Sequence, residues 1–348
     1  MFTQNLQGEN PMIMTTSRAL ICSPSESHAT AVDIARRSGL EMLPLEERLF
    51  AEGEFRIRPL ASVRERTVFV FQSLAGSDAA SISERLVRLL LLLFALRDAG
   101  VTRLIGIVPY LCYARSDKRS EARDPVNTRY VAQLLEAATL DSLVCLDVHN
   151  LAALENAFRI PVDHLSALPL FARHFGECLP TNEVVVASPD IGGIKRAQSF
   201  QAILARELDK ETGLAFVEKR RSQSGVSGGT VAGTVAGKVV IVLDDLCSSG
   251  ETLLNAARSL VAAGAREVHV AFTHAPSGSG LDAVVSSSDI SSVVTTDSVI
   301  LTDHEVRADP GRFCRLGIAP LLAEAVGRIS VGAPLSPLLH RWPPTSGS

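Results

Sequence analysis

Short apolar runs, many of them rich in β-branched residues, alternate along the chain with longer stretches that carry apolar residues at helical spacing. The short runs predict strands and the longer stretches predict helices. The predicted strands cover 18–22, 67–71, 103–108, 142–147, 183–187, 215–218, 239–243, 268–273 and 292–295. The predicted helices cover 29–38, 79–99, 126–138, 167–175, 195–208 and 252–263. This alternation is typical of an α/β fold whose parallel strands are joined by crossover helices.

The pattern runs through two halves of similar content, which indicates two related α/β domains within the 348 residues. We predict an N-terminal extension over 1–17, a first domain over 18–164 and a second domain over 165–330. The segment 222–237 is rich in Gly, Ser and Val and is expected to form a flap or a hairpin. The tail over 331–348 contains several Pro and Ser residues and is expected to be loose.

Composition narrows the classes of function. The net charge of −4 argues against bulk binding of nucleic acid, so that any phosphate chemistry must use local clusters of basic residues. The most apolar run, 89–96, is bounded by Arg88 and Arg97 and is far shorter than the ~20 residues that cross a bilayer. The six cysteines are scattered without a CxxC pair, which predicts reduced thiols and a cytoplasmic protein.

The stretch 239–252 carries the clearest chemical signal. Its apolar strand leads directly into two carboxylates, Asp244 and Asp245, and then into a short turn rich in hydroxyl groups that precedes a helix. Ligands bind at the carboxyl ends of the strands in open α/β sheets. The turn offers backbone amides, hydroxyls and the positive end of a helix to a phosphate. The carboxylates suit sugar hydroxyls or a Mg²⁺ ion between the protein and its ligand.

Three other strand ends are followed by residues that suit anions. The loop 115–123 gathers four cations, an arrangement that suits a polyphosphate. The stretch 188–197 places paired glycines before a helix, where backbone amides approach an anion closely, and adds the charges of Lys195 and Arg196. The basic residues 219–221 lead into the Gly- and Ser-rich segment and are positioned to close over phosphates and exclude water.

Six motifs together resemble those of the ribose-phosphate pyrophosphokinases, also called phosphoribosyl-pyrophosphate (PRPP) synthetases. They occur in the order of that family and lie at 50–54, 109–126, 146–150, 188–196, 218–221 and 239–252. A further stretch, 272–278, is similar to the segment that follows the last main strand in the family. The resemblance implies two tandem phosphoribosyltransferase-like domains, each a mostly parallel sheet flanked by helices. It also implies transfer of the diphosphoryl group of ATP to the C1 hydroxyl of ribose 5-phosphate, which gives PRPP and AMP.

Matched residue by residue, the resemblance implies four groups of contacts. The contacts to ATP are Phe50, Glu52, Glu54, Arg115, Ser116, Asp117 and Arg123. The contacts to ribose 5-phosphate are Asp244, Asp245, Ser248, Ser249, Gly250, Glu251 and Thr252. The pyrophosphate loop contains Asp190, Gly192 and Gly193, and the Mg²⁺ ligands are His149 and Asp190. The charge that develops during transfer is neutralised by the catalytic residues Lys219, Arg221 and Arg115.

The resemblance also implies assembly and leaves alternatives open. Members of the family form homo-oligomers, commonly hexamers, whose ATP sites use a neighbouring subunit. Three residues depart from the family pattern: Ser116 replaces Gln, Ser248 replaces Asp and Glu251 replaces Gly. Because each departure falls on an implied substrate contact, a weakly active regulatory paralogue is an alternative. A phosphoribosyltransferase that consumes PRPP is less favoured because of the motifs for ATP, and a generic nucleotide-binding module leaves the ordered motifs unexplained.

Overall fold

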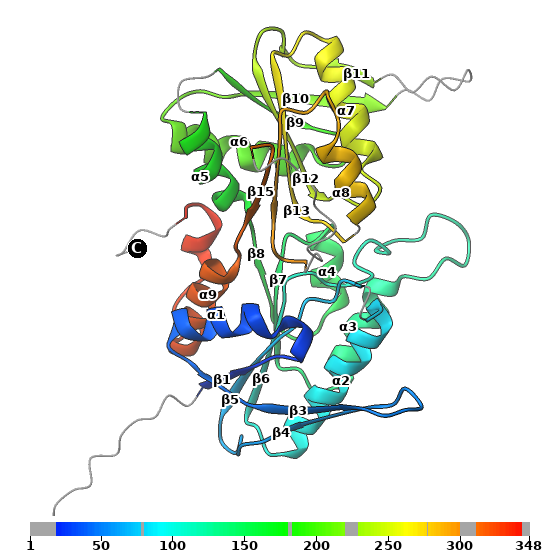
Figure 1. Cartoon of the computed structure of the whole chain (residues 1–348), viewed down its shortest axis with the longest axis vertical. Helices are drawn as coiled ribbons and strands as arrows, with labels where there is room; N and C mark the ends of the chain where they lie inside the picture. The colour runs from blue at the N-terminus through cyan, green and yellow to red at the C-terminus, as the bar shows by residue number, and fades with distance from the viewer. Residues whose placement is uncertain are drawn as a thin grey trace, which may run out of the picture.

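A six-stranded parallel sheet organises the first half of the chain (Figure 1). The structure, a computed structural model, describes residues 19–77, 80–179, 183–219, 229–276, 278–299 and 311–342. The strand order is β2-β1-β5-β6-β7-β8. These strands are β1 (Ala19–Cys22), β2 (Glu41–Met42), β5 (Thr67–Phe71), β6 (Arg103–Val108), β7 (Ser142–Leu146) and β8 (Val162–Leu165). Their helices are α1 (His28–Ser38), α2 (Ile82–Asp98), α3 (Asn127–Ala137) and α4 (Leu151–Ala157).

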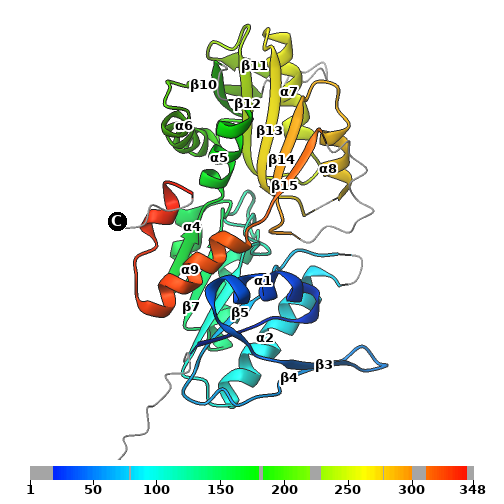
Figure 2. The ribbon, with the colours of Figure 1, turned by 60° about the vertical axis from the view of Figure 1, so that its left-hand side comes forward.

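A seven-stranded sheet organises the second half, in the order β11-β10-β9-β12-β13-β14-β15 (Figure 2). All its pairings are parallel except that of β10 with β11. The strands are β9 (Val184–Ser188), β10 (Gly213–Lys219), β11 (Gly229–Ala232), β12 (Val239–Leu246), β13 (Glu267–His274), β14 (Ser292–Thr296) and β15 (Phe313–Leu316). The helices are α5 (Leu168–Cys178), α6 (Ile194–Leu208), α7 (Glu251–Ala262) and α8 (Gly278–Val285).

The side chains of each strand point alternately to the two faces of its sheet, and this alternation explains the layered core. In β12, Ile241 and Leu243 pack on the side of α5 and α6, whereas Val240 and Val242 pack on the side of α7 and α8. Because helices cover both faces, the strands are apolar at successive positions rather than at every second one. The predicted two-domain α/β fold with mostly parallel sheets is confirmed, and each predicted strand and helix is present with ends shifted by at most three residues.

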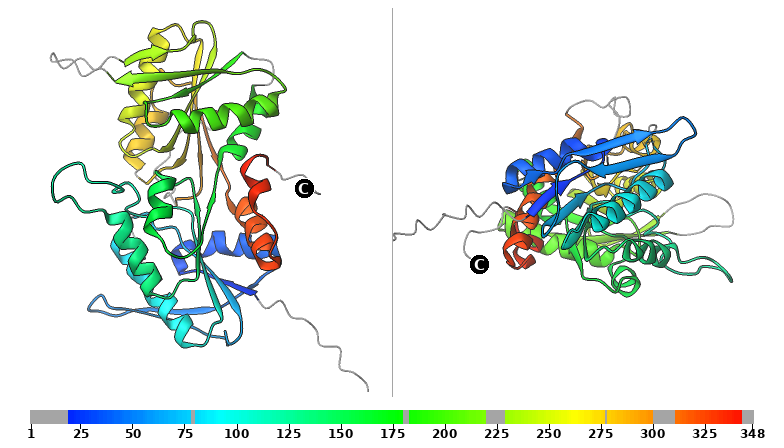
Figure 3. Two further views of the ribbon diagram at one scale, coloured as in Figure 1. Left: turned by 180° about the vertical axis from the view of Figure 1, so that it is seen from behind. Right: turned by 90° about the horizontal axis from the view of Figure 1, so that it is seen from below.

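A hairpin that the sequence analysis did not predict lies at the end of the first unit (Figures 1 and 3). Its strands are β3 (Leu45–Leu49) and β4 (Phe55–Pro59), and they pair with each other rather than with the large sheet. A tight turn at 50–54 closes it, in which the backbone N–H of Phe50 donates to the carbonyl of Glu54 over 2.9 Å. In the second unit, β11 forms the far side of the expected hairpin at 222–237, whereas residues 220–228 lie outside the described part.

The end of the chain returns to the first unit. Helix α9 (Ala319–Val331) packs against α1, and its buried Leu322 and Val326 share one apolar cluster with Ile34 (Figure 2). The same cluster includes residues of both sheets, so the two units are joined by a continuous core. The boundaries at 164 and 330 stay predictions, but α9 contacts the first unit although the prediction places it in the second.

The expectation of a loose tail over 331–348 is wrong for its middle part. A short 3₁₀ helix, Ser336–Leu339, places Leu338 in the core with 0% exposure. Leu335 and Trp342 pack against the same cluster. These three apolar side chains hold the segment against the core, because burial of each one away from water lowers the free energy of the folded state. Residues 343–348, like the predicted extension over 1–17, lie outside the described residues.

All six cysteines are free, and four of them are buried. No helix in the described ranges has the length and apolar character that are needed to cross a membrane.

The packing of α9 predicts a loss of stability when its buried side chains are shortened. Leu322 is 1% exposed, and Leu322→Ala keeps a good helix former while it leaves a cavity against α1. We expect the free energy of unfolding to fall by roughly 2–5 kcal/mol, measured by urea denaturation. Val331→Ala on the same helix is the control, because Val331 is 80% exposed. Equal losses for the two variants would contradict this account of the α1–α9 contact.

Candidate active site

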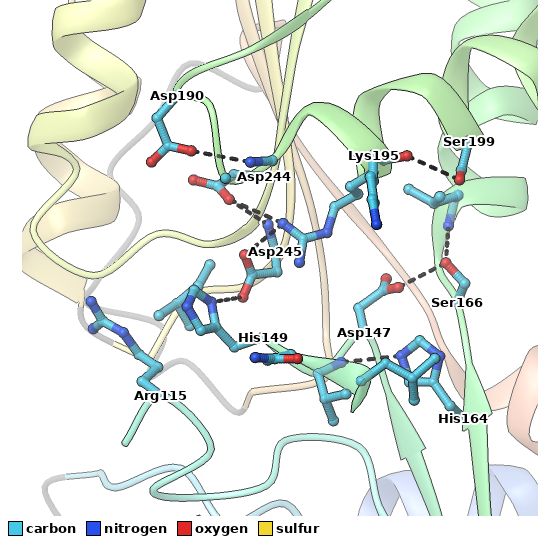
Figure 4. A pocket seen from close by; sticks show the side chains of 18 of the residues that line it. Arg115, Asp147, His149, His164, Ser166, Asp190, Lys195, Ser199, Asp244 and Asp245 are labelled. Carbon is cyan, nitrogen blue, oxygen red and sulfur yellow. Dashed lines mark hydrogen bonds and ion pairs between the residues drawn. The ribbon is translucent and has the colours of Figure 1, made fainter. Parts of the chain in front are cut away.

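A cavity of about 1250 Å³ lies where the carboxyl ends of strands from both sheets face each other (Figure 4). Five of the loops that line it follow strands: the loops after β6, β7, β8, β9 and β12. The predicted site residues that line the cavity are Arg115, Asp117, His149, Asp190, Gly192, Gly193, Asp244, Asp245, Ser248, Ser249, Gly250 and Thr252. Parallel strands bring their carboxyl ends to one edge of a sheet, which explains how motifs far apart in the sequence converge here.

The carboxylates at the end of β12 are held by a cation from α6. The Nη1 atom of Arg196 lies 2.7 Å from Oδ1 of Asp245 and 3.4 Å from Oδ1 of Asp244. On its other side, Oδ2 of Asp245 lies 3.0 Å from Nδ1 of His149. Asp245 is only 4% exposed, so this carboxylate is buried between two basic groups. The sequence predicts that Arg196 adds positive charge near a phosphate, but the structure places its guanidinium against the two carboxylates.

The two neighbouring carboxylates have opposite shifts of pKa. Burial, followed by the negative charge of Asp245, raises the pKa of Asp244 to about 7. Burial alone would also raise the pKa of Asp245, but the hydrogen bond from His149 and the charge of Arg196 together hold it below its usual range. The same hydrogen bond raises the pKa of His149. Asp245 is therefore a fixed acceptor at neutral pH, whereas Asp244 changes its charge close to neutrality.

The turn after β12 has the geometry of an anion cradle. Gly250 adopts a φ of 76°, and a Cβ atom there would lie 2.7 Å from the carbonyl oxygen of Gly280, so a larger residue would displace the turn. Helix α7 begins directly afterwards, and its N-terminus carries partial positive charge that suits an anion. Ser248 and Ser249 line the cavity with Thr252, whereas the exposed Glu251 does not. The turn therefore presents hydroxyls and amides to a ligand, with one negative charge at its rim.

The loop after β9 is fixed by its own hydrogen bonds. Oδ1 of Asp190 accepts from the backbone N–H of Gly193 over 3.1 Å, and Oγ of Ser188 donates to the carbonyl of Asp190 over 2.6 Å. A Cβ atom on Gly193 would lie 2.6 Å from Oγ of Ser188, which explains why glycine is needed there. This loop closes the cavity on the side of α6.

The loop after β6 brings cations to the opposite side. Arg115 and Lys118 line the cavity, and Oδ2 of Asp117 accepts from Nδ2 of Asn150 over 2.6 Å. Ser116 does not line it. Its hydroxyl donates to the carbonyl of Pro125 over 3.1 Å and accepts from the N–H of Asn127 over 3.3 Å, so it closes the loop onto the start of α3.

Four other predicted contacts are not brought to this cavity. Phe50, Glu52 and Glu54 lie in the turn of the β3–β4 hairpin, and none of them lines it. The guanidinium of Arg48 lies 4.7 Å from the centre of the Phe50 ring. Arg123, which has a φ of 73°, does not line the cavity either. The contacts of these residues with ATP stay predictions.

The side chains of the two predicted cations of the closing segment lie outside the described part of the structure. Lys219 ends β10, where its backbone pairs with that of Gly229. Nothing is described of its side chain, and Arg221 lies outside the described residues.

Sequence reasoning missed the residues that hold the loop after β7. Nε2 of His164 accepts from the backbone N–H of Val148 over 3.2 Å, next to His149. Asn150 caps α4, because its Oδ1 accepts from the N–H of Ala153 over 3.2 Å. An Asn directly before a helix is a recognisable capping signal, but no local pattern indicates the contact of His164.

The described residues contain no group of three or more His, Cys, Asp or Glu side chains arranged to hold a metal ion alone. The two predicted metal ligands, His149 and Asp190, both line the cavity. Any ion held by this pair needs further ligands from a substrate or from water.

Comparisons with known proteins cover nearly the whole described chain. Residues 19–139 match the family described as the N-terminal domain of ribose phosphate pyrophosphokinase, and residues 169–300 match the phosphoribosyl transferase domain. A ribose-phosphate pyrophosphokinase of Granulibacter bethesdensis is 37% identical over 322 residues, which cover 92% of this chain and 99% of that protein. One of Fusobacterium nucleatum is 34% identical and covers 92% of this chain and 98% of its own length.

A solved structure gives the same result. The crystal structure of phosphoribosylpyrophosphate synthetase from Mycobacterium smegmatis matches with a TM-score of 0.80 at 29% identity. The match covers 90% of this chain and 99% of that one. The similarity therefore extends over both sheets and the cavity between them.

The pairing of Arg196 with two carboxylates predicts a pH-dependent loss of stability in Arg196→Gln. At about pH 8 both Asp244 and Asp245 are ionised, and loss of the guanidinium leaves two buried like charges, which costs roughly 3 kcal/mol of unfolding free energy. At about pH 6 Asp244 binds a proton in the folded protein, because its pKa is raised, and the loss is smaller.

Thermal unfolding at both pH values measures this difference. Lys195→Gln is the control, because Lys195 is the neighbouring exposed cation on the same helix. The account fails when Arg196→Gln loses as much stability at the lower pH as at the higher one.

Proposed function

This chain belongs to the ribose-phosphate pyrophosphokinase family, and on that basis we propose roles for the residues of its cavity. The chain is an ATP-dependent diphosphotransferase that makes PRPP. The reaction moves the diphosphoryl group of ATP onto the C1 hydroxyl of ribose 5-phosphate and releases AMP. The Asp244–Asp245 pair is intact and shares its cavity with the cationic loop after β6. No feature of the cavity favours a regulatory paralogue or a phosphoribosyltransferase that consumes PRPP.

The observation that carries the ribose side is the buried Asp245, fixed between Arg196 and His149. Because it stays ionised, its oxygens accept hydrogen bonds from ribose hydroxyls without a change of protonation. Asp244, next to it, accepts from the same sugar. The 5-phosphate then lies on the turn 248–252, where amides, hydroxyls and the start of α7 provide the complementary charge.

On the ATP side, Arg115 and Lys118 bind the phosphates from the loop after β6. Ser116 does not contact the nucleotide in this proposal, because its hydroxyl is engaged with Pro125 and Asn127. The adenine contacts Phe50, Glu52 and Glu54 are supplied by the hairpin of a second copy, because the hairpin of the same chain does not line this cavity. This arrangement requires a homo-oligomer, and the family resemblance favours a hexamer.

The pair His149 and Asp190 fits a Mg²⁺ ion that is shared with substrate phosphates. Asp190 uses Oδ1 to hold Gly193, which leaves its second oxygen for an ion. His149 uses Nδ1 on Asp245, which leaves Nε2. A ring nitrogen that hydrogen-bonds a carboxylate orients the opposite nitrogen toward a metal. When bound, Mg²⁺ neutralises charge on the transferring diphosphoryl group.

The protein side chains contribute orientation and charge rather than a covalent intermediate. The C1 hydroxyl must lie in line with the β-phosphorus, so both substrates have to be fixed in one cavity. Arg115 remains beside the phosphates, and Lys219 and Arg221 join it when their segment closes. Cations that arrive on closure stabilise the developing charge while they exclude water, which would otherwise compete with the sugar hydroxyl. We place the reaction in the cytoplasm, in keeping with six free cysteines.

The decisive experiment is the formation of AMP and PRPP in equal amounts from ATP, Mg²⁺ and ribose 5-phosphate. We expect Asp190→Asn to lower the rate by roughly 10- to 100-fold, because it removes a proposed metal ligand. Asp33→Asn is the control, since Asp33 pairs with Arg36 and Arg37 on the surface of α1 and does not line the cavity. Hydrolysis of ATP without PRPP, or full activity of Asp190→Asn, would contradict the proposed roles.

The charge at the rim of the phosphate turn predicts a second effect. Glu251 is exposed and begins α7 beside the proposed 5-phosphate, so it repels that group across solvent. Removal of such a charge is worth at most about 1 kcal/mol, so Glu251→Gln should lower the KM for ribose 5-phosphate by about two- to fivefold. Glu251→Asp keeps the charge and should leave the KM unchanged. Steady-state kinetics at low and high salt test whether the effect is electrostatic, because added salt should remove the difference in KM between Glu251→Gln and the wild type.

A further inference from the structure

A line of buried hydrogen bonds, which we name the seam, joins the two sheets next to the cavity, and its member Asp147 also lines that cavity. From the second sheet it contains Thr273 and His274, at the end of β13, and Ser298, which follows β14. From the first sheet it contains Ser73, which follows β5, and Leu146 and Asp147, at the end of β7. The hydroxyl of Ser73 donates to the carbonyl of Ser298 over 2.6 Å, and that of Thr273 donates to Oδ2 of Asp147 over 2.6 Å.

His274 is the central member of the seam. Its Nε2 lies 2.9 Å from the carbonyl oxygen of Leu146, and its Nδ1 lies 2.8 Å from Oγ of Ser298. A carbonyl only accepts, so Nε2 carries a proton and donates it. Burial lowers the pKa of His274, which favours the neutral ring. Nδ1 of this ring accepts from the hydroxyl of Ser298, which also lies 3.0 Å from the carbonyl oxygen of Thr273. The ring therefore has one defined tautomer and satisfies both nitrogens without reaching the cavity.

The backbone of the same residue holds the phosphate turn. The carbonyl of His274 accepts from the N–H of Cys247 over 2.8 Å, directly before Ser248. Its side chain meanwhile holds Leu146, three residues before His149. His274 thus contacts the beginning of the turn 248–252 through its backbone carbonyl. Through its ring it contacts the end of β7, which leads into the loop that carries His149. The edge of the ring also contacts Tyr110, with the ring centres 5.2 Å apart, at the start of the cationic loop.

The loop that His274 fastens is strained and needs external support. Asp147 has a φ of 38°, which is unfavourable for a residue with a side chain. Its carboxylate accepts from Thr273, from the hydroxyl of Ser166 over 2.7 Å and from the N–H of Ala167 over 2.8 Å. These bonds together define the path by which the chain carries His149 into the cavity.

We infer that His274 is a positioning residue, whose ring fixes the loop that carries His149 relative to the turn that binds the sugar phosphate. This inference rests on the proposed roles of both loops. The ribose site is built within the second sheet and its helices, whereas the metal-binding loop belongs to the first. Loss of the ring contact therefore shifts one loop against the other. The alignment of the two loops affects the rate of transfer strongly, whereas it affects the binding of the sugar phosphate less.

The test compares two amides at position 274. The amide nitrogen of glutamine has about the reach of Nε2 and can donate to Leu146, whereas that of asparagine is too short. We expect His274→Asn to lower kcat by roughly 10- to 100-fold, with the affinity for ribose 5-phosphate, measured by calorimetry, unchanged within about twofold. His274→Gln should restore most of kcat.

A matched pair at position 269 controls for the general cost of losing a buried histidine. His269 lies on the same strand, is 8% exposed, and hydrogen-bonds Ser292 away from the seam. We expect His269→Asn and His269→Gln to lower the melting temperature while kcat at about 25 °C stays near that of the wild type.

The outcomes separate this inference from the proposed function. A wild-type protein that makes no PRPP overturns the function, and with it any role of His274. Wild-type turnover with an active His274→Asn variant overturns the inference alone. So does a His274→Asn variant that loses affinity for ribose 5-phosphate in proportion to kcat, or a His274→Gln variant that is no better than His274→Asn.

Discussion

Two adjacent carboxylates at the end of a buried strand are the constraint around which this molecule is organised. Removal of both from water would be prohibitive without compensation, because each loses its hydration and they repel each other. Arg196 compensates the pair from α6, and His149 reaches Asp245 from the other sheet. The pKa values of the two carboxyl groups therefore shift in opposite directions: Asp245 is stabilised as an anion, while the pKa of Asp244 rises. A sugar with several hydroxyls is a ligand that such a pair can accept without burial of further charge.

That constraint also determines how the two units meet. Because His149 comes from the first sheet, the compensation of Asp245 holds only when the carboxyl ends of both sheets face each other. The continuous apolar cluster and the return of α9 onto α1 keep this orientation over the length of the chain. The seam acts closer to the cavity, where directional hydrogen bonds fix the alignment of loops that apolar contacts alone would leave free to slide. Large apolar contacts thus set the arrangement of the units, and buried polar contacts set the arrangement of the loops.

The sequence predicts the strand and helix pattern well because that pattern is local. It also predicts strand ends whose loops line the cavity, as Asp244 follows 239–243, but the predicted contacts Phe50 and Arg123 do not line it. It does not predict the β3–β4 hairpin, whose strands alternate charged residues such as Glu46 and Arg58 and bury little. Nor does it predict the bonds of Thr273 and His274 to the end of β7, because those partners are 126 and 128 residues away. No periodicity records such pairs.

The departures from the family pattern have different physical consequences, although the sequence presents them alike. The short hydroxyl of Ser116 closes its own loop onto the start of α3. The longer side chain of the family pattern is absent here, but the loop becomes more rigid. The contact of Asp117 with Asn150 joins this loop to the one that carries His149. A cationic loop that is fixed before ATP arrives loses less conformational entropy on binding. The side chain of Glu251, by contrast, gains no partner within the described residues that would offset its charge, and in the proposed site it would act by repulsion alone. The departure at Ser116 is therefore compensated within the fold, whereas the departure at Glu251 acts through the substrate.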